Sequence, residues 1–124
     1  MSECIEIDVR GIGKPRMTRS DSWKRRECVL RYWEYKDTLV MGCLKENYVI
    51  GDRVSIDFVF RVPESLSRKK GEELLKAGKH QVKPDLDNLV KGVLDSLKER
   101  DQEVYYIEAS KRWGEEDKII MKNL

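Results

Sequence analysis

The chain has 124 residues, of which 40% are hydrophobic and 39% charged, and its formal net charge is +2. This length and composition predict one folded domain over residues 1–124 with a densely charged surface, and they exclude a disordered chain. No apolar run approaches a membrane span, and the opening MSECIEIDVR lacks the apolar core of a signal peptide, so we expect a cytoplasmic protein.

Two strands and a helix are predicted in the first half of the chain. Residues 4–9 alternate apolar and polar side chains, which indicates a strand, and residues 10–26 contain glycines, a proline and many basic residues without periodicity. Such a long loop inside a compact domain is typical of a functional or a disordered segment. Residues 28–46 space apolar side chains by three and four, which predicts an amphipathic helix ending near Asn47, and residues 53–62 alternate as a second strand.

Two further helices and two strands are predicted in the second half. A serine and two glutamates favour a short helix within residues 64–78, and Gly78 would end it. A longer helix is expected over residues 85–98, and residues 103–113 and 118–124 read as strands paired in a hairpin. The resulting order, β-α-β-α-α-β-β, predicts an α/β (mixed α+β) domain whose mixed sheet is packed by helices.

Three cysteines, Cys4, Cys28 and Cys43, are an odd number and show no CxxC or Cys/His spacing. This pattern argues against a disulfide framework and against a zinc site. We therefore interpret them as buried or idle thiols.

The charge is unevenly distributed along the chain. From Arg10 to Lys36 nine basic residues stand against three acids, and from Arg68 to Lys83 six stand against two, whereas acids outnumber bases after Asp85. Two basic segments that flank an acidic one suggest a polyanion held around a cation-binding centre. The residues expected to contact phosphates, rather than to form a merely solvated surface, are Lys14, Arg16, Arg19, Lys24, Arg25, Lys79 and Lys83.

Asp85 and Asp87 stand at the start of the 85–98 helix, directly after Pro84. One interpretation is structural, because aspartates there cap backbone N–H groups and favour the helix dipole. The other is chemical, because clustered carboxylates bind Mg²⁺ or Mn²⁺, which bridge phosphates. Lys91 shares a helix face with Asp87, where it can make a surface ion pair or steady the charge on a reacting phosphate. With two basic flanks, the pattern favours a nuclease.

The same residues resemble a known family. DLDNLVKGVLDSL followed by DQEV is similar to the signature of the RusA-like Holliday junction resolvases, which has DLDN, a lysine, D-[AS]-L and then an acidic pair with Gln-Val. GKPRMTRSDSWKRR, VLRYWEYKDTL and SKRWG look like the phage and prophage branch. The resemblance implies a homodimeric, Mg²⁺-dependent endonuclease that nicks four-way DNA junctions symmetrically during recombination and repair, with Mn²⁺ as a substitute metal.

The resemblance also implies roles for individual residues. Asp85 and Asp87 match the first two catalytic acids, Lys91 the catalytic lysine and Asp101 the third acid, and the three aspartates would hold the metal. The two-fold dimer would form through the apolar side of the 28–46 helix or through an edge strand.

The match around Asp101 is imperfect. Arg100 stands where the family has the first acid of the pair, and the preceding linker is shorter than in the family. Glu99 and Glu103 therefore remain alternative ligands. The competing hypothesis is a non-catalytic protein that binds branched DNA and whose aspartates are only helix caps.

Overall fold

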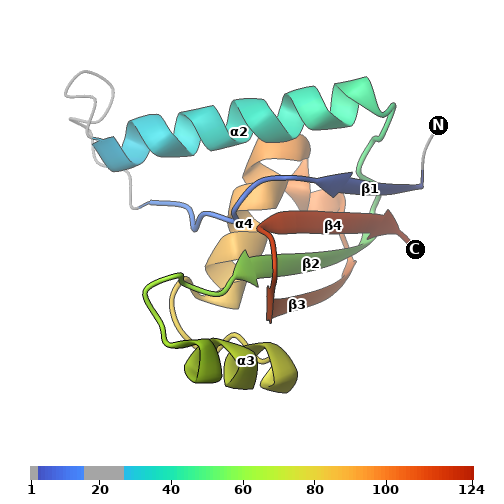
Figure 1. Cartoon of the computed structure of the whole chain (residues 1–124). Coiled ribbons are helices and arrows are strands. Elements are labelled where there is room, and N and C mark those ends of the chain that lie inside the picture. Colours follow the sequence, from blue (N-terminus) through green and yellow to red (C-terminus); the bar gives the residue numbers. More distant parts are fainter. Residues whose placement is uncertain (1–2, 16–26) are drawn as a thin grey trace.

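The computed structural model describes residues 3–15 and 27–124. These residues form a mixed four-stranded sheet with three α-helices, in the order predicted from the sequence, which confirms the fold class (Figure 1). The elements are β1 (Cys4–Ile7), α2 (Glu27–Lys45), β2 (Arg53–Arg61), α3 (Arg68–Ala77), α4 (Leu86–Leu97), the 3₁₀ turn η1 (Asp101–Glu103), β3 (Tyr106–Gly114) and β4 (Lys118–Asn123).

The strand order is β1-β4-β2-β3, so the predicted hairpin of the last two strands is wrong. β4 lies between β1 and β2 and is antiparallel to both, whereas β3 pairs in parallel with the outer side of β2. Ile119 and Met121 of β4 are fully buried, and a central strand buries such residues better than an edge strand. Alternating residues and a turn signal predict two strands but do not specify that they pair with each other. Here the burial of β4 side chains favours its central position between β1 and β2.

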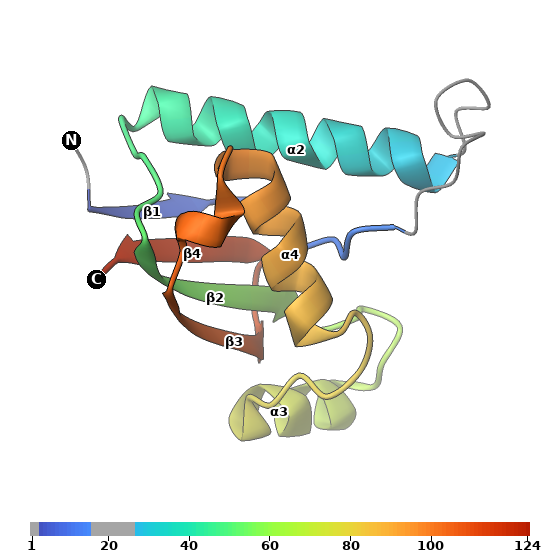
Figure 2. The same ribbon diagram turned by 180° about the vertical axis from the view of Figure 1, so that it is seen from behind.

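One face of the sheet carries the hydrophobic core. Figures 1 and 2 show α2 along the β1 side and α4 across this face, while the opposite face has no helix laid across it. Alternate strand residues point toward the two helices, as period-two patterning requires. The largest fully buried side chains are Tyr32, Phe58, Phe60, Leu39, Ile56, Leu89, Ile119, Met121, Val29, Val54 and Val93.

The local end signals of the helices operate as predicted. Ser67 accepts a hydrogen bond from the Lys70 backbone nitrogen at 3.2 Å and so caps α3, and Gly78 ends that helix with φ of 75°. α2 stops at Lys45, and Asn47 follows it in the left-handed region with φ of 55°. These boundaries depend on residues a few positions apart, which is why the sequence predicts them.

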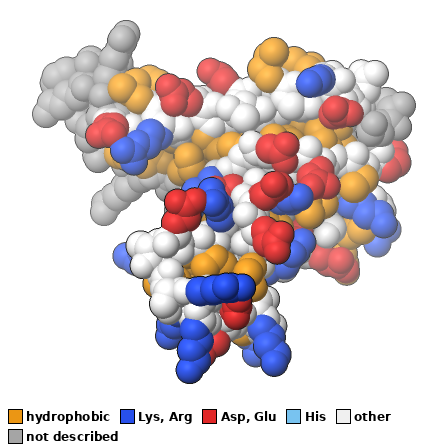
Figure 3. All heavy atoms as spheres, in the orientation of Figure 1, with side chains coloured by type: hydrophobic (Ala, Val, Ile, Leu, Met, Phe, Trp, Pro, Cys, Tyr) orange, Lys and Arg blue, Asp and Glu red, His pale blue; other side chains and the backbone are white. Residues whose placement is uncertain are grey.

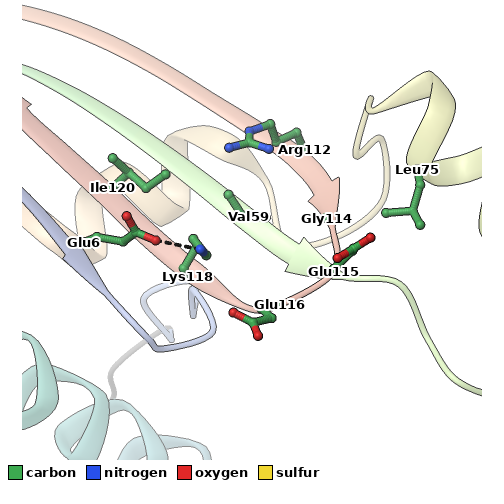
Figure 4. A pocket seen from close by; sticks show the side chains of 9 residues that line it. All are labelled: Glu6, Val59, Leu75, Arg112, Gly114, Glu115, Glu116, Lys118 and Ile120. Carbon is green, nitrogen blue, oxygen red and sulfur yellow. Dashed lines mark hydrogen bonds and ion pairs between the residues drawn. The ribbon is translucent and has the colours of Figure 1, made fainter.

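The open face of the sheet contains a hollow of about 630 Å³ between its strands and α3 (Figure 4). Acidic and basic side chains both line it, and Lys118 already donates to Glu6 at 2.6 Å. Of the residues predicted to act in catalysis or DNA binding, none that the structure describes lines this hollow.

Neither membrane helices nor bonded cysteines are found in the part of the chain that the structure describes. No helix there is long and apolar enough to cross a bilayer. Cys4 and Cys28 are exposed free thiols, and Cys43 is a buried one.

Candidate active site

The first turn of α4 leaves two carboxylates uncommitted. Asp85 occupies the N-cap position with extended backbone, φ −68° and ψ 142°, yet its side chain makes no capping hydrogen bond. Asp87 is exposed in the first helical turn. Neither side chain has an ion-pair or hydrogen-bond partner among the described residues. The capping interpretation of Asp85 therefore does not describe this helix, and both carboxylates are available to a ligand.

Asp85 lies at a depression of about 360 Å³ where the N-terminal loop meets the start of α4. Lys14 and Lys83, two of the residues predicted to contact phosphates, line the same depression. Segments far apart in the sequence thus bring positive charge next to the first aspartate of the motif. The lining residues are Gly13, Lys14, Pro15, Lys83, Pro84, Asp85 and Asn88.

The loop reaches this position because it packs directly on α4. Asn88, the last residue of DLDN, donates from Nδ2 to the backbone oxygen of Lys14 at 3.2 Å. A Cβ atom on Gly13 would lie only 2.5 Å from that Nδ2, and a Cβ atom on Gly92 would lie 3.1 Å from the backbone oxygen of Ile12. The two glycines are needed for this close approach, which holds the start of the basic loop beside Asp85.

Asp95 of α4 holds both the N-terminal loop and α2 against this helix. Its carboxylate accepts from Tyr32 Oη at 2.8 Å, Lys36 Nζ at 3.2 Å and Lys14 Nζ at 3.3 Å. Burial by itself would raise the pKa of Asp95, but the hydrogen bonds from Tyr32, Lys36 and Lys14 outweigh it and lower the pKa. Asp95 is therefore a charged structural anchor, and the positive charge of Lys14 is shared with it.

Residues 78–84, which we call the strap, lead from α3 to the start of α4 and are held by the sheet. His80 is buried between the rings of Phe60 and Trp113, at centroid distances of 4.2 and 4.4 Å. Lys111 Nζ donates to the backbone oxygens of Val82 at 2.6 Å and Pro84 at 2.8 Å. These contacts position Lys83 and Asp85 relative to the sheet.

The third predicted acid lies at the other end of α4. Asp101 begins η1 after the helix, and the twelve residues of α4 span about 18 Å. The alternatives Glu99 and Glu103 lie at that end too. In residues 3–15 and 27–124 no group of three His, Cys, Asp or Glu side chains is placed to hold a metal ion. Within the described residues of the single chain, Asp85 and Asp87 therefore lie together at the start of α4, apart from Asp101.

Comparison with known proteins completes the assignment. The family model described as Endodeoxyribonuclease RusA matches residues 13–122, which covers the N-terminal loop, the DLDN segment and Asp101. The chain belongs to the RusA endodeoxyribonuclease family. No curated protein and no solved structure matches the chain. RusA membership confirms the resemblance seen in the motifs, and it implies an endonuclease of Holliday junctions with branched DNA as its substrate.

The remaining predicted residues of this RusA protein are placed as follows. Lys91 is exposed on α4, with no acid at ion-pair distance among the described residues, so the alternative of a surface ion pair is not what the structure has. Lys79 and Lys83 are exposed on the strap. Four of the predicted phosphate contacts lie outside the described residues, namely Arg16, Arg19, Lys24 and Arg25.

Sequence reasoning missed Asn88, Asp95 and Lys111 as the residues that assemble this RusA site. One signal was present, because Lys111 interrupts the apolar alternation of β3 on the side that faces the helices. Asn88 and Asp95 both stand in the matched signature, as the last residue of DLDN and the first of D-[AS]-L, but their contacts were not predicted because the partners Lys14, Tyr32 and Lys36 are distant in the sequence.

Proposed function

We propose that this RusA protein is a Mg²⁺-dependent endonuclease that resolves four-way DNA junctions by paired symmetrical nicks, with Mn²⁺ able to substitute. The observation that carries the proposal is the free carboxylate of Asp85. It stands where a capping hydrogen bond would be favourable, yet makes none, and Asp87 beside it is equally uncommitted. Asp85 lines the same depression as Lys14 and Lys83, which suit an approaching phosphate backbone.

The roles of the residues follow from their chemistry. Asp85, Asp87 and Asp101 would hold the ion, since carboxylate oxygens are the ligands that Mg²⁺ prefers. A bound Mg²⁺ would supply Lewis acidity and ease the deprotonation of the attacking water. Lys91 stands one turn beyond Asp87 and pairs with no acid of the described residues, so it would stabilise the negative charge that grows on the phosphate. Water is the nucleophile, and no covalent intermediate with the enzyme is required.

The position of Asp101 leads us to propose a composite site in a homodimer. Because α4 separates Asp101 from Asp85 within one protomer, the third carboxylate at each site would be Asp101 of the partner subunit. A two-fold axis then creates two identical sites. A four-way junction has approximate two-fold symmetry, so two such sites would make matched nicks in opposing strands.

An apolar groove suits a second copy of the chain. The groove, about 240 Å³, lies between the C-terminal half of α2 and the end of α4, the end at which Asp101 lies. Leu44 and Val49 in its lining are 68% and 60% exposed, which is unusual for large apolar side chains. A partner seated there would cover them, and of the two interfaces expected from the sequence, α2 and an edge strand, this groove supports the first.

The alternative function is a protein that binds branched DNA without cutting it. One observation favours it, namely that the described residues of a single protomer hold no three-carboxylate group. The free carboxylate of Asp85 argues against the helix-cap role that this alternative assigns to it.

The test is to incubate the purified full chain with a synthetic four-way junction in Mg²⁺, in Mn²⁺ and in EDTA. We expect paired nicks with either metal and none in EDTA. Asp87→Asn should slow nicking by more than about a hundredfold, because the metal contributes several kcal/mol to the transition state. Its binding should be intact or tighter, because the change also removes a charge that repels phosphate.

Asp37→Asn is the matched control, since Asp37 is exposed on α2 and distant in the sequence from the proposed ligands. Junction binding under all conditions, with nicks under none, would favour the non-catalytic alternative. An Asp87→Asn protein that cuts at the wild-type rate would remove Asp87 from the site.

A further inference from the structure

Helix α3 carries positive charge that no ion pair among the described residues neutralises. Lys69, Lys70 and Lys76 have no acid at ion-pair distance among the described residues, and Lys79 just beyond the helix is likewise unpaired. Arg68 pairs with Glu72 at 3.1 Å, but at 94% and 66% side-chain exposure such a pair is weak. Figure 3 shows Lys and Arg side chains gathered at the lower end of the molecule, where α3 lies.

The helix dipole accounts for Lys76 in the last turn of α3, but not for the basic residues in the first turn. The first turn of α3 contains basic residues and no acid, and cations there oppose the helix dipole. Ser67 already satisfies the cap. α3 has no buried residue, and in Figure 4 Leu75 reaches from it only to the rim of the hollow on the sheet. Leu74 is partly buried against the core, and the helix otherwise presents its lysines to solvent.

α3 is nevertheless held firmly in relation to the active site. The Gly78 backbone oxygen, at the end of the helix, accepts a hydrogen bond from the Trp113 backbone nitrogen at 2.8 Å. The backbone of Lys79 forms an isolated antiparallel β-bridge with that of Arg112 in β3. His80 then anchors the strap between two rings, and the strap leads directly to Asp85. A ligand bound along α3 is therefore set at a fixed position relative to the two aspartates.

We propose that α3 and Lys79 form a second DNA-binding surface, which grips the phosphate backbone of a duplex arm beside the site of cleavage. The inference rests on the proposed action on branched DNA and adds a contact outside the metal site. A ten-residue helix is about 15 Å long, enough to follow several successive phosphates. Because the strap is anchored, this contact would set the register of the arm relative to Asp85.

The experiment compares Lys69→Gln/Lys76→Gln with Lys45→Gln/Lys122→Gln, which removes the same charge from lysines that are also exposed and have no ion-pair partner within residues 3–15 and 27–124. Lys45 and Lys122 lie near the ends of α2 and β4, away from α3 (Figure 1). Junction affinity is measured in EDTA over a series of salt concentrations. The slope of log affinity against log salt should decrease by about one for each lysine that contacts a phosphate. The control should keep the wild-type slope.

Hydroxyl-radical footprinting of the same complexes locates the contact. The α3 variant should lose protection over a few consecutive nucleotides of one duplex arm, and Lys69→Arg/Lys76→Arg should restore it. Slopes equal to the control, or an unchanged footprint, would overturn the inference. Nicking in Mg²⁺ is scored separately, so a protein that binds through α3 without ever nicking would overturn the proposed nuclease and leave the second DNA surface standing.

Discussion

Asp85, Asp87 and Asp95 belong to one short helix and its cap, yet their surroundings differ. Asp95 accepts from a tyrosine and two lysines, whereas the side chains of Asp85 and Asp87 make no hydrogen bond or ion pair with the residues that the structure describes. A carboxylate whose lone pairs already accept hydrogen bonds has few lone pairs free to coordinate a metal ion. For this reason we assign ligand roles to the first two aspartates and a structural role to the third.

His80 is the residue whose ionisation should affect stability most clearly. Burial between Phe60 and Trp113 lowers its pKa from the ordinary value of 6.5, the positive charge of Lys111 lowers it further, and Arg10 adds to this effect. As the pH falls below 6.5, the unfolded chain therefore binds a proton that the native protein does not. We expect the free energy of unfolding to decrease by up to about 1 kcal/mol between about pH 7.5 and pH 5.5 from this residue.

Urea unfolding at both pH values measures this effect, and His80→Phe is the control. Phenylalanine retains a ring between Phe60 and Trp113 but does not titrate. The wild type should lose more stability on acidification than His80→Phe. Equal losses in the two proteins would show that His80 ionises as freely in the native state as in the unfolded chain.

At the scale of elements, the contact between the N-terminal loop and α4 creates the depression beside Asp85. A methyl group on Gly13 would meet Asn88 Nδ2 at 2.5 Å, so either the loop or the amide must move. We expect Gly13→Ala to lower the free energy of unfolding by about 1–3 kcal/mol. Junction nicking should decrease as well, because the loop carries Lys14 into the site.

Gly71→Ala is the matched control for urea unfolding. Gly71 lies within α3, and a methyl group there meets only Val62, at an ordinary distance of 3.4 Å. Alanine should stabilise the helix by about 0.5–1 kcal/mol, because glycine is the weaker helix former. Opposite signs for the two substitutions are expected. A Gly13→Ala protein as stable as the wild type would mean that the loop does not need its close approach to Asn88.

At the scale of the whole molecule, the proposed ligands lie at opposite ends of α4. A shared site makes a specific prediction for mixed dimers. Asp87→Asn and Asp101→Asn should each be inactive alone, but a heterodimer of the two has one site with all three carboxylates intact. If each site uses Asp101 of the partner subunit, this heterodimer should nick one strand of a junction. If each site lies within one protomer, it should be inactive.

Differently tagged chains, co-expressed and purified through both tags, provide the heterodimer, and a strand-resolved nicking assay provides the measurement. The control pairs Asp85→Asn with Asp87→Asn. Both changes affect the same half of the proposed site, so no complete site forms in either arrangement. A heterodimer of Asp87→Asn and Asp101→Asn that forms with the expected mass but never nicks would contradict the shared site.

The sequence by itself determined the elements and the family. Helix and strand periods, the Ser67 and Gly78 end signals and the DLDN segment involve residues close together in the chain, so their physical effects are local. This is why the order of elements and the RusA resemblance were predicted correctly.

Only the tertiary structure decided the position of β4, the structural use of Asp95 and the separation of Asp101 from Asp85. Each depends on which distant segments share a core. Burial of Ile119 and Met121 draws β4 into the centre of the sheet, and the packing of α2 on α4 brings Tyr32 to Asp95. Such choices come from the summed burial and hydrogen bonding of the whole chain, which no short stretch of sequence contains.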